Sequence, residues 1–217
     1  MSEPPVNTTL TAVLARSRAD YRARWYAVDQ ELYELCSRRP SQHDFADVYA
    51  KVVIIGRVYA AGISRSSRAD GDREAAVAQG IVRQAAEIDA ALKALASVQF
   101  NRATAARIIE LHARTARGLK QYTGERWLQS FVSKYLHFHC TLVPILDSRA
   151  ETCIGGLVDW TSVYSIRAAI GRPPDWLTGY YNFATAFVAL SERIALEAGA
   201  SASVKEIDHM LWRGKWQ

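Results

Sequence analysis

The chain has 217 residues, of which 49% are hydrophobic and 23% are charged, a composition typical of a globular protein. No apolar run approaches the ~18 residues needed to cross a membrane, and residues 1–10 lack the basic and apolar regions of a signal peptide. We therefore expect a cytoplasmic protein without a membrane anchor. The net charge of +5 favours an anionic partner, for which nucleic acid is the commonest choice.

Almost every periodic segment of the sequence predicts a helix. In residues 72–97, for example, apolar side chains recur near i, i+3, i+4 and i+7. No stretch alternates apolar and polar residues for long enough to require a strand. The expected helices are, in chain order, residues 9–20, 21–38, 44–64, 72–97, 102–120, 126–139, 146–157, 160–170, 174–198 and 203–213.

The predicted helices are separated by short breaks, with no internal repeat and no low-complexity tract. This pattern indicates an all-α protein in which residues 1–217 form one domain. Residues 122–150 contain most of the chemically distinctive side chains. Because this segment lies past the middle of the chain, we expect N-terminal and C-terminal helices to pack around it.

Lys134 is an isolated lysine in an apolar and aromatic run, residues 131–138. Lysine is rarely buried without a partner or a function. Its stem can lie along the neighbouring rings while the amine stays in water. Alternatively, Lys134 lies in an aromatic cleft, where burial lowers the pKa of the amine and makes it a nucleophile.

Asp147 follows the apolar residues 142–146 and precedes a new helix. This is a common position for a helix N-cap, in which the carboxylate accepts backbone N–H groups. A carboxylate fixed in this way is also suited to stabilising a cation or directing a water molecule. The two roles are compatible, and the sequence leaves both open.

Cysteine and histidine spacing predicts no metal site and no cofactor. Cys36, Cys140 and Cys153 contain no CxxC pair and are expected to be reduced thiols. His137 and His139 are two residues apart, so on a helix they point in different directions. No third ligand of suitable spacing accompanies them.

Residues 130–138 (SFVSKYLHF) and 144–150 (PILDSRA) together resemble the core of the helix-hairpin-helix DNA glycosylase superfamily. The similarity is closest to its divergent 8-oxoguanine-glycosylase-like branch, in which a lysine-bearing helix is followed by an apolar turn that ends in aspartate. The resemblance implies a compact, two-lobed helical fold. It also implies a partner, DNA, from which a base is flipped out and excised by cleavage of the N-glycosidic bond.

The resemblance assigns roles to individual residues. Lys134 takes the position of the lysine that attacks the sugar C1′, which would add strand cleavage to base excision. Asp147 takes the position of the aspartate that stabilises the sugar cation or, in an enzyme without a lysine nucleophile, directs water. The further residues expected to contact DNA or the base are His137, His139, Arg149, Arg126, Trp127 and Tyr135.

The sequence also departs from the family pattern. Residues 122–127 contain one glycine where the family has Leu-Pro-Gly-Val-Gly, and three cysteines cannot build the four-cysteine iron–sulfur site of some members. Such divergent glycosylases occur among antiphage defences. The expected target is therefore a hydroxymethylated or glucosylated cytosine of phage DNA, or otherwise an oxidised base in repair.

Two other classes of function remain open. The first is a non-catalytic helical defence protein that binds nucleic acid or a protein partner. The second is a HEPN-like ribonuclease, since Arg107 and His112 have the required spacing, although Ile108 replaces the polar residue expected beside the arginine. In each case we expect a monomer.

Overall fold

The computed structural model describes residues 9–59, 61–63, 72–171, 178–199 and 201–214, which form eleven α-helices with no β-strand among them. The prediction of an all-α protein is therefore confirmed. The helices are α1 (Leu10–Arg24), α2 (Tyr26–Arg38), α3 (Phe45–Val58), α4 (Arg73–Val82), α5 (Ala85–Leu95), α6 (Arg102–Leu119), α7 (Gln129–His139), α8 (Ser148–Ile154), α9 (Trp160–Ile170), α10 (Thr178–Ala198) and α11 (Val204–Arg213); a short 3₁₀ helix, η2 (Lys120–Tyr122), follows α6.

Most helices begin where a short polar side chain can accept the free N–H groups of the first turn. Ser203 and Glu206 form a complete capping box at the start of α11. These caps explain why most predicted helices begin close to the observed positions. The residues whose side chains cap a helix in this way are Thr9, Asp44, Asp72, Asn101, Asp147, Asp159 and Ser203.

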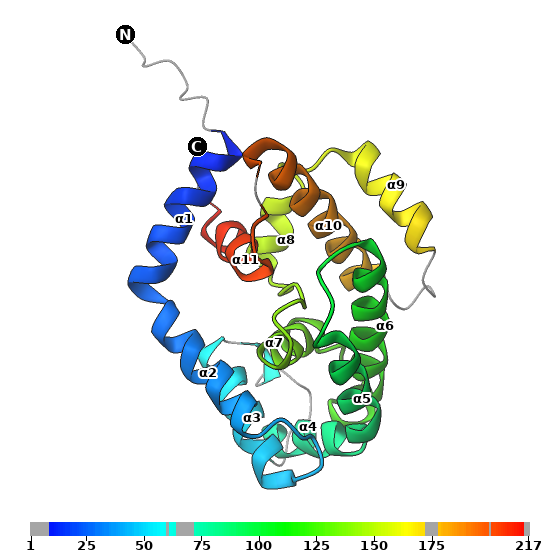
Figure 1. The fold of residues 1–217 in the computed structure, drawn as a ribbon. Coiled ribbons are helices and arrows are strands. Elements are labelled where there is room, and N and C mark those ends of the chain that lie inside the picture. Colours follow the sequence, from blue (N-terminus) through cyan, green and yellow to red (C-terminus); the bar gives the residue numbers. More distant parts are fainter. Residues whose placement is uncertain (1–8, 60, 64–71, 172–177, 200, 215–217) are drawn as a thin grey trace.

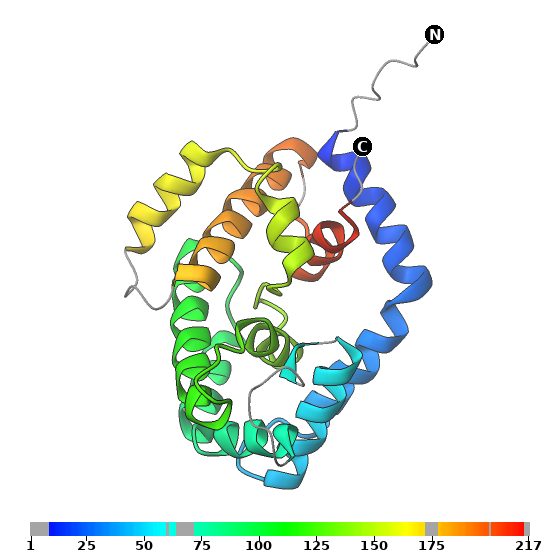
Figure 2. The same cartoon turned by 180° about the vertical axis from the view of Figure 1, so that it is seen from behind.

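Helix α7 lies in the middle of the molecule and is seen nearly end-on in both ribbon views (Figures 1 and 2). It packs against α2, α3 and α6, and all its residues from Phe131 to Phe138 are buried. Helices α8 to α11 lie on one side of α7, and α11 packs against both α1 and α8. N-terminal helices, α2 and α3, thus contact the motif segment at α7, and the C-terminal helix α11 contacts it at α8.

The predicted helix 72–97 is in fact two helices, α4 and α5, with a break at Arg83 and Gln84. The Gln84 side chain turns back and donates a hydrogen bond to the carbonyl oxygen of Gly80, with a distance of 2.9 Å. A β-carbon on Gly118 of α6 would come within 2.3 Å of the Gln84 carboxamide. Close packing against α6 thus accompanies the break, and apolar periodicity alone does not reveal it.

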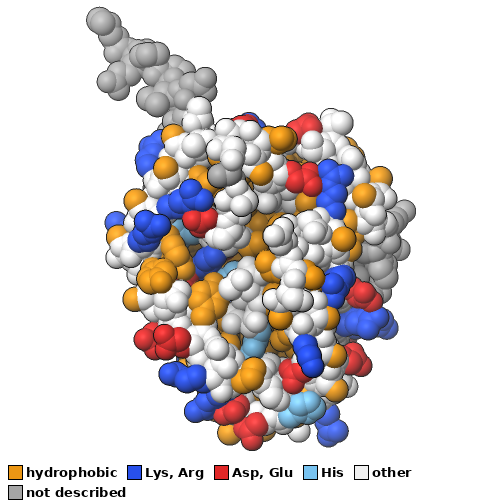
Figure 3. Space-filling model, in the orientation of Figure 1, with side chains coloured by type: hydrophobic (Ala, Val, Ile, Leu, Met, Phe, Trp, Pro, Cys, Tyr) orange, Lys and Arg blue, Asp and Glu red, His pale blue; other side chains and the backbone are white. Residues whose placement is uncertain are grey.

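Other helix ends differ less from the prediction. Helix α3 ends at Val58 rather than near residue 64, and α7 begins at Gln129 rather than at 126. Within the part of the chain that the structure describes, no helix has both the length and the apolarity to cross a membrane. Figure 3 shows acidic and basic side chains interspersed over one face of the molecule, so the positive net charge is not gathered into one field there.

Candidate active site

Lys134 is buried on α7, with 3% of its surface exposed. Its amine donates hydrogen bonds to Ser130 Oγ at 3.1 Å and to the carbonyl oxygen of Tyr59 at 3.3 Å. The amine nitrogen is 3.8 Å from Oδ2 of Asp147. Burial lowers the pKa of the Lys134 amine, and the charge of Asp147 is the largest influence in the opposite direction. The alternative in which the stem of Lys134 lies along the neighbouring rings and its amine stays in water is therefore wrong, because the side chain is buried.

Asp147 is the N-cap of α8, and its two carboxylate oxygens have different environments. Oδ1 accepts the backbone N–H groups of Arg149 at 2.8 Å and Ala150 at 3.3 Å. Oδ2 faces the Lys134 amine. The capping bonds confirm the predicted N-cap and fix the carboxylate, while its other oxygen stays available beside the Lys134 amine.

The loop between α7 and α8 is held by side chains on its neighbouring helices. Ser133 Oγ accepts the backbone N–H of Leu146 at 3.0 Å. The Nδ1–H of His137 donates to the carbonyl oxygen of Val143 at 2.8 Å, and the Tyr180 hydroxyl donates to that of Pro144 at 2.9 Å. These bonds fix the loop that carries Asp147 against α7 and α10.

A cavity of about 440 Å³ lies beside the Lys134–Asp147 pair. Its walls come from the α1–α2 junction, the end of α3, α7, the start of α8 and α11. This volume falls in the range of roughly 300–1,000 Å³ that is common for small-molecule sites. The cavity is therefore large enough to admit a small planar group.

The α11 wall of the cavity contains a second set of charged groups. Lys205 is 3.0 Å from Oδ2 of Asp29 and 3.4 Å from Oδ2 of Asp208. Asp29 is fully buried and also accepts a hydrogen bond from the Tyr59 hydroxyl. Burial, mainly, raises the pKa of Asp208 to about 6.

Aromatic rings line another part of the cavity. Trp25 and Trp212 pack edge to face, with ring centroids 5.4 Å apart. The Arg149 guanidinium lies 5.1 Å from the centre of the Trp212 ring. The cavity thus combines apolar ring faces with ammonium, guanidinium and carboxylate groups, which suits a planar polar ligand attached to an anionic chain.

Three of the residues singled out from the sequence, Lys134, Asp147 and Arg149, come together at this cavity. His137 does not line it. The His137 ring is fully buried and accepts a hydrogen bond from the Tyr33 hydroxyl at 2.6 Å, and burial lowers its pKa to about 3. This ring stays neutral and holds the loop before Asp147 through its bond to Val143, so His137 supports the loop instead of facing the cavity.

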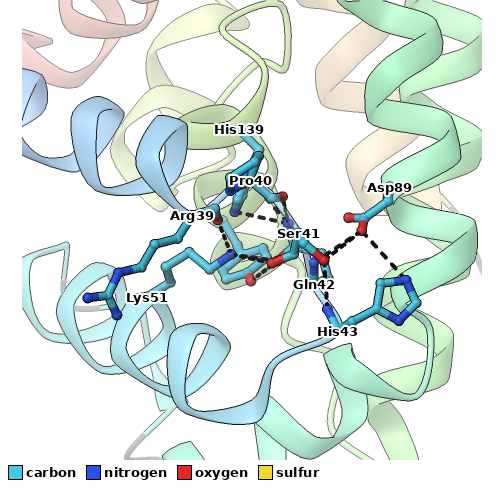
Figure 4. Close-up of polar contacts among 9 residues, drawn as sticks. Arg39, Pro40, Ser41, Gln42, His43, Lys51, Asp89 and His139 are labelled. Atoms are coloured by element: carbon cyan, nitrogen blue, oxygen red, sulfur yellow. Dashed lines mark hydrogen bonds and ion pairs between the residues drawn. The ribbon is translucent and has the colours of Figure 1, made fainter.

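Tyr135 and His139 lie outside the cavity, in a separate polar cluster around Gln42. Figure 4 shows His139 in this cluster. The Tyr135 hydroxyl donates to the side-chain oxygen of Gln42, whose amide nitrogen is 3.4 Å from the His139 ring nitrogens. Lys51 donates to the same Gln42 oxygen at 2.9 Å. Burial lowers the pKa of His139 to about 3. Because neither residue lines the cavity, the expected contacts of Tyr135 and His139 with a base in the cavity do not fit their positions.

Trp127 and Arg126 lie between η2 and α7 and do not line the cavity. The Lys120 ammonium lies 4.9 Å from the centre of the Trp127 ring. Arg126 is exposed, and its carbonyl oxygen accepts a hydrogen bond from the Thr123 hydroxyl at 2.8 Å. Trp127 is therefore not placed to pack beside a group in the cavity, whereas Arg126 stays available to a phosphate at the surface.

Arg107 and His112 of the ribonuclease alternative do not form a shared site. His112 is buried, stacks on Tyr180 with a centroid distance of 3.6 Å and bonds the backbone carbonyl of Gln129 at 2.9 Å. The guanidinium of Arg107 donates to the carbonyl oxygen of Ala94 at 2.9 Å. Among the described residues, no group of three or more histidine, cysteine or acidic side chains could hold a metal ion.

Sequence reasoning missed Trp25, Asp29 and the α11 residues of the cavity. One signal was present in α11, where Val204, Ile207, Asp208 and Leu211 recur at helical spacing and are all buried. An aspartate on an apolar stripe needs a partner or a function, by the same argument that selects Lys134. No local pattern reveals Trp25, which lines the cavity from the α1–α2 junction, or Asp29 of α2, which lies behind the wall and contacts Lys205.

Comparisons with known proteins give no further assignment. No protein-family model matches the sequence, and neither a curated protein nor a solved structure matches the chain. The function is therefore inferred from the geometry of the cavity together with the motif in residues 130–150.

Proposed function

We propose that the protein is a DNA N-glycosylase whose active site is the cavity at Lys134 and Asp147. The observation that carries the proposal is the 3.8 Å approach of a buried amine to a rigidly capped carboxylate at the wall of a 440 Å³ cavity. The motif in residues 130–150 resembles that of the helix-hairpin-helix glycosylases, which use this pair of groups. A base flipped out of DNA would enter the cavity and pack against Trp25 and Trp212.

Bond cleavage assigns a separate task to each of the two groups. As the bond between the sugar C1′ and the base nitrogen breaks, the base leaves with the bonding electrons and acquires a proton. The negative charge of Asp147 Oδ2 stabilises the positive charge that develops on the sugar. Lys134, in its neutral form, donates its lone pair to C1′ and forms a new C–N bond.

The lowered pKa of Lys134 supports this role, because only the unprotonated amine has a free electron pair. The covalent amine–sugar intermediate then permits strand cleavage at the abasic site. If Lys134 serves only as a contact, Asp147 directs a water molecule to C1′ instead. Both routes require Asp147, which makes this carboxylate the first residue to test.

The substrate class that we propose is a modified base, either a hydroxymethylated or glucosylated cytosine of phage DNA or an oxidised base. Arg149 and Arg126 supply positive charge near the cavity mouth and at the surface for DNA phosphates. The alternative function is a non-catalytic DNA-binding defence protein, which would use the same basic residues.

The test is to count abasic sites after incubation with DNA that is unmodified or contains uracil, 8-oxoguanine, hydroxymethylcytosine or glucosylated cytosine. The wild type is compared with Asp147→Asn and with Asp159→Asn. Asp159 caps α9 just as Asp147 caps α8, but it is exposed and lies outside the cavity. Because asparagine is as good an N-cap as aspartate, both variants are expected to fold.

We expect abasic sites from the wild type and Asp159→Asn on at least one DNA, and a loss of at least about 100-fold in Asp147→Asn. Equal activity in the two variants would remove Asp147 from the chemistry. DNA binding by all three proteins without abasic sites on any substrate would favour the non-catalytic alternative.

A further inference from the structure

Asp208 is a second carboxyl group in the same cavity, and no step described above uses it. It is 7% exposed, and its Oδ2 atom is 3.4 Å from the Lys205 ammonium. No described residue donates a hydrogen bond to its Oδ1 atom. A nearly buried carboxylate with one long hydrogen bond is poorly stabilised, so its protonated form is favoured.

The charges around the cavity lead to the same conclusion. Among the described residues, three carboxyl groups, those of Asp29, Asp147 and Asp208, lie near two amines, those of Lys134 and Lys205, and burial favours the neutral form of Lys134. The third cation of the cavity wall, Arg149, is exposed and stacks on a tryptophan ring. If all three carboxyl groups were ionised, the interior would carry an excess negative charge.

The three carboxyl groups do not share that excess equally. Asp29 accepts the Tyr59 hydroxyl and lies closer to Lys205 than Asp208 does, at 3.0 Å against 3.4 Å. Asp147 accepts two backbone N–H groups and has a more exposed side chain, at 20% against 9% for Asp208. Of the three, Asp208 is the carboxyl group that both lines the cavity and is nearly buried, so burial favours its protonated form at the cavity wall.

We propose, on the basis of the function proposed above, that Asp208 is the general acid that protonates the departing base. As the C1′–N bond breaks and the base leaves with the bonding electrons, the proton of the Asp208 carboxyl moves to the base. The carboxylate that remains is stabilised by Lys205, and a proton from water restores it after the base leaves.

The pKa of Asp208, raised to about 6, supports this assignment. A base that fills the cavity removes water from the carboxyl group and favours its protonated form further. Asp147 and Asp208 thus supply two carboxyl groups with different environments and different tasks, a common arrangement for acid–base chemistry near neutral pH. The ionisable groups that act on Asp208 are Lys205 on α11, Asp147 before α8, Lys134 on α7, Asp29 and Tyr33 on α2, Tyr59 after α3 and Tyr21 on α1.

The first part of the test needs no substrate. Infrared difference spectra of protein with ¹³C-labelled aspartate would be recorded between pH 5 and pH 7 for the wild type, Asp208→Asn and Asp20→Asn. Asp20 is a matched control, because its carboxylate also contacts α11, through His209 at 3.2 Å, but lies outside the cavity. Thermal unfolding and DNA binding check that each variant is folded.

We expect a protonated carboxyl band that disappears with a midpoint near pH 6 in the wild type and in Asp20→Asn but is missing from Asp208→Asn. A wild-type protein with no carboxyl group titrating in this range would overturn the proposal, as would an unchanged band in Asp208→Asn. This result does not depend on glycosylase activity, so the general acid and the proposed function can fail separately.

The second part uses the DNA whose base the wild type releases, and the same DNA with a fluorine on that base. Fluorine stabilises the departing anion and reduces the need for a general acid. We expect Asp208→Asn to release the natural base about 100-fold more slowly than the wild type, and the deficit to shrink at least tenfold on the fluorinated base. Equal deficits on both bases would show that Asp208 only supports the structure.

Discussion

Two lysines of this molecule, Lys51 and Lys134, are buried in different surroundings. Lys51 of α3 is fully buried and donates to the carbonyl oxygens of Arg39 and Ser41 and to the side chain of Gln42, at 2.9, 3.1 and 2.9 Å (Figure 4). Lys134 of α7 has two longer hydrogen bonds and a carboxylate 3.8 Å away, at the wall of a cavity. Burial lowers the pKa of both amines.

The comparison teaches that burial and a lowered pKa do not identify a functional lysine. Lys51 is surrounded by neutral oxygen acceptors that fix the loop between α2 and α3, and it does not line the cavity at Lys134. Lys134 has space beside it that a reactant can fill. We therefore propose that the two amines differ in function because of what surrounds each of them.

The largest effect is expected from Lys134→Met, which removes the nucleophile. If Lys134 attacks the sugar, borohydride reduction of a reaction mixture will trap a covalent protein–DNA complex, and mass spectrometry will locate the sugar on Lys134. We expect Lys134→Met to form no such complex and to release the base about 10²–10⁴-fold more slowly. Lys51→Met should be trapped as efficiently as the wild type. Attachment at any other lysine would contradict the assignment.

The next largest effect is a loss of folding stability, and we expect it from Lys51→Met. Lys51→Met leaves the carbonyl oxygens of Arg39 and Ser41 without this donor and removes one of the two donors to the Gln42 side chain. We expect it to lower the free energy of unfolding by about 3 kcal/mol. Lys134→Met removes two longer hydrogen bonds, and Asp147 keeps its two backbone N–H donors, so we expect a smaller loss of about 1 kcal/mol. Urea denaturation of both variants measures the difference. Equal losses would mean that Lys134 is as much a structural residue as Lys51.

A pH effect specific to Asp208 is expected on the cavity side. The pKa of Asp208 rises from 3.8 in the unfolded chain to about 6 in the folded protein, so the folded state binds more protons between these values. The stabilisation from this proton is present below pH 4 and is lost as the pH rises through 6. Between pH 4 and pH 7 we expect Asp208→Asn to gain about 3 kcal/mol of stability relative to the wild type. Denaturation at several pH values measures this change, and a constant difference would count against a protonated Asp208.

The smallest effect is expected from Arg149→Gln. This change removes one positive charge and a stacking contact with Trp212 at the cavity wall. We expect DNA binding to weaken about fivefold, or about 1 kcal/mol, and the salt dependence of the binding constant to fall by about one unit of slope. Fluorescence anisotropy at several salt concentrations measures both. An unchanged slope would mean that Arg149 does not contact a phosphate.

The sequence predicted the helices well because their N-terminal caps and apolar periodicity are local features. Asp147, for example, was expected to cap a helix and does so. The break between α4 and α5 was missed, because it depends on the contact of Gln84 with Gly118, a residue distant in sequence.

The candidate site was predicted only in part, for a related reason. Lys51 also lies in an apolar run, residues 50–55, so the pattern that selected Lys134 does not distinguish the two lysines. His139 and Tyr135 are close to Lys134 in sequence, but they point toward Gln42 instead of the cavity. A large part of the cavity wall comes from α11 and the α1–α2 junction, and their approach to α7 depends on the tertiary fold.

The most direct measurement is the rate of abasic-site formation by Asp147→Asn and by Lys51→Met, each expressed per folded molecule, on the DNA to which the wild type responds. We expect Asp147→Asn to be folded, to bind this DNA and to form at least about 100-fold fewer abasic sites. Lys51→Met should retain the wild-type rate in its folded fraction. A fully active Asp147→Asn protein, or a wild type that forms no abasic sites on any of the DNAs, would contradict the assignment of this cavity as a glycosylase active site.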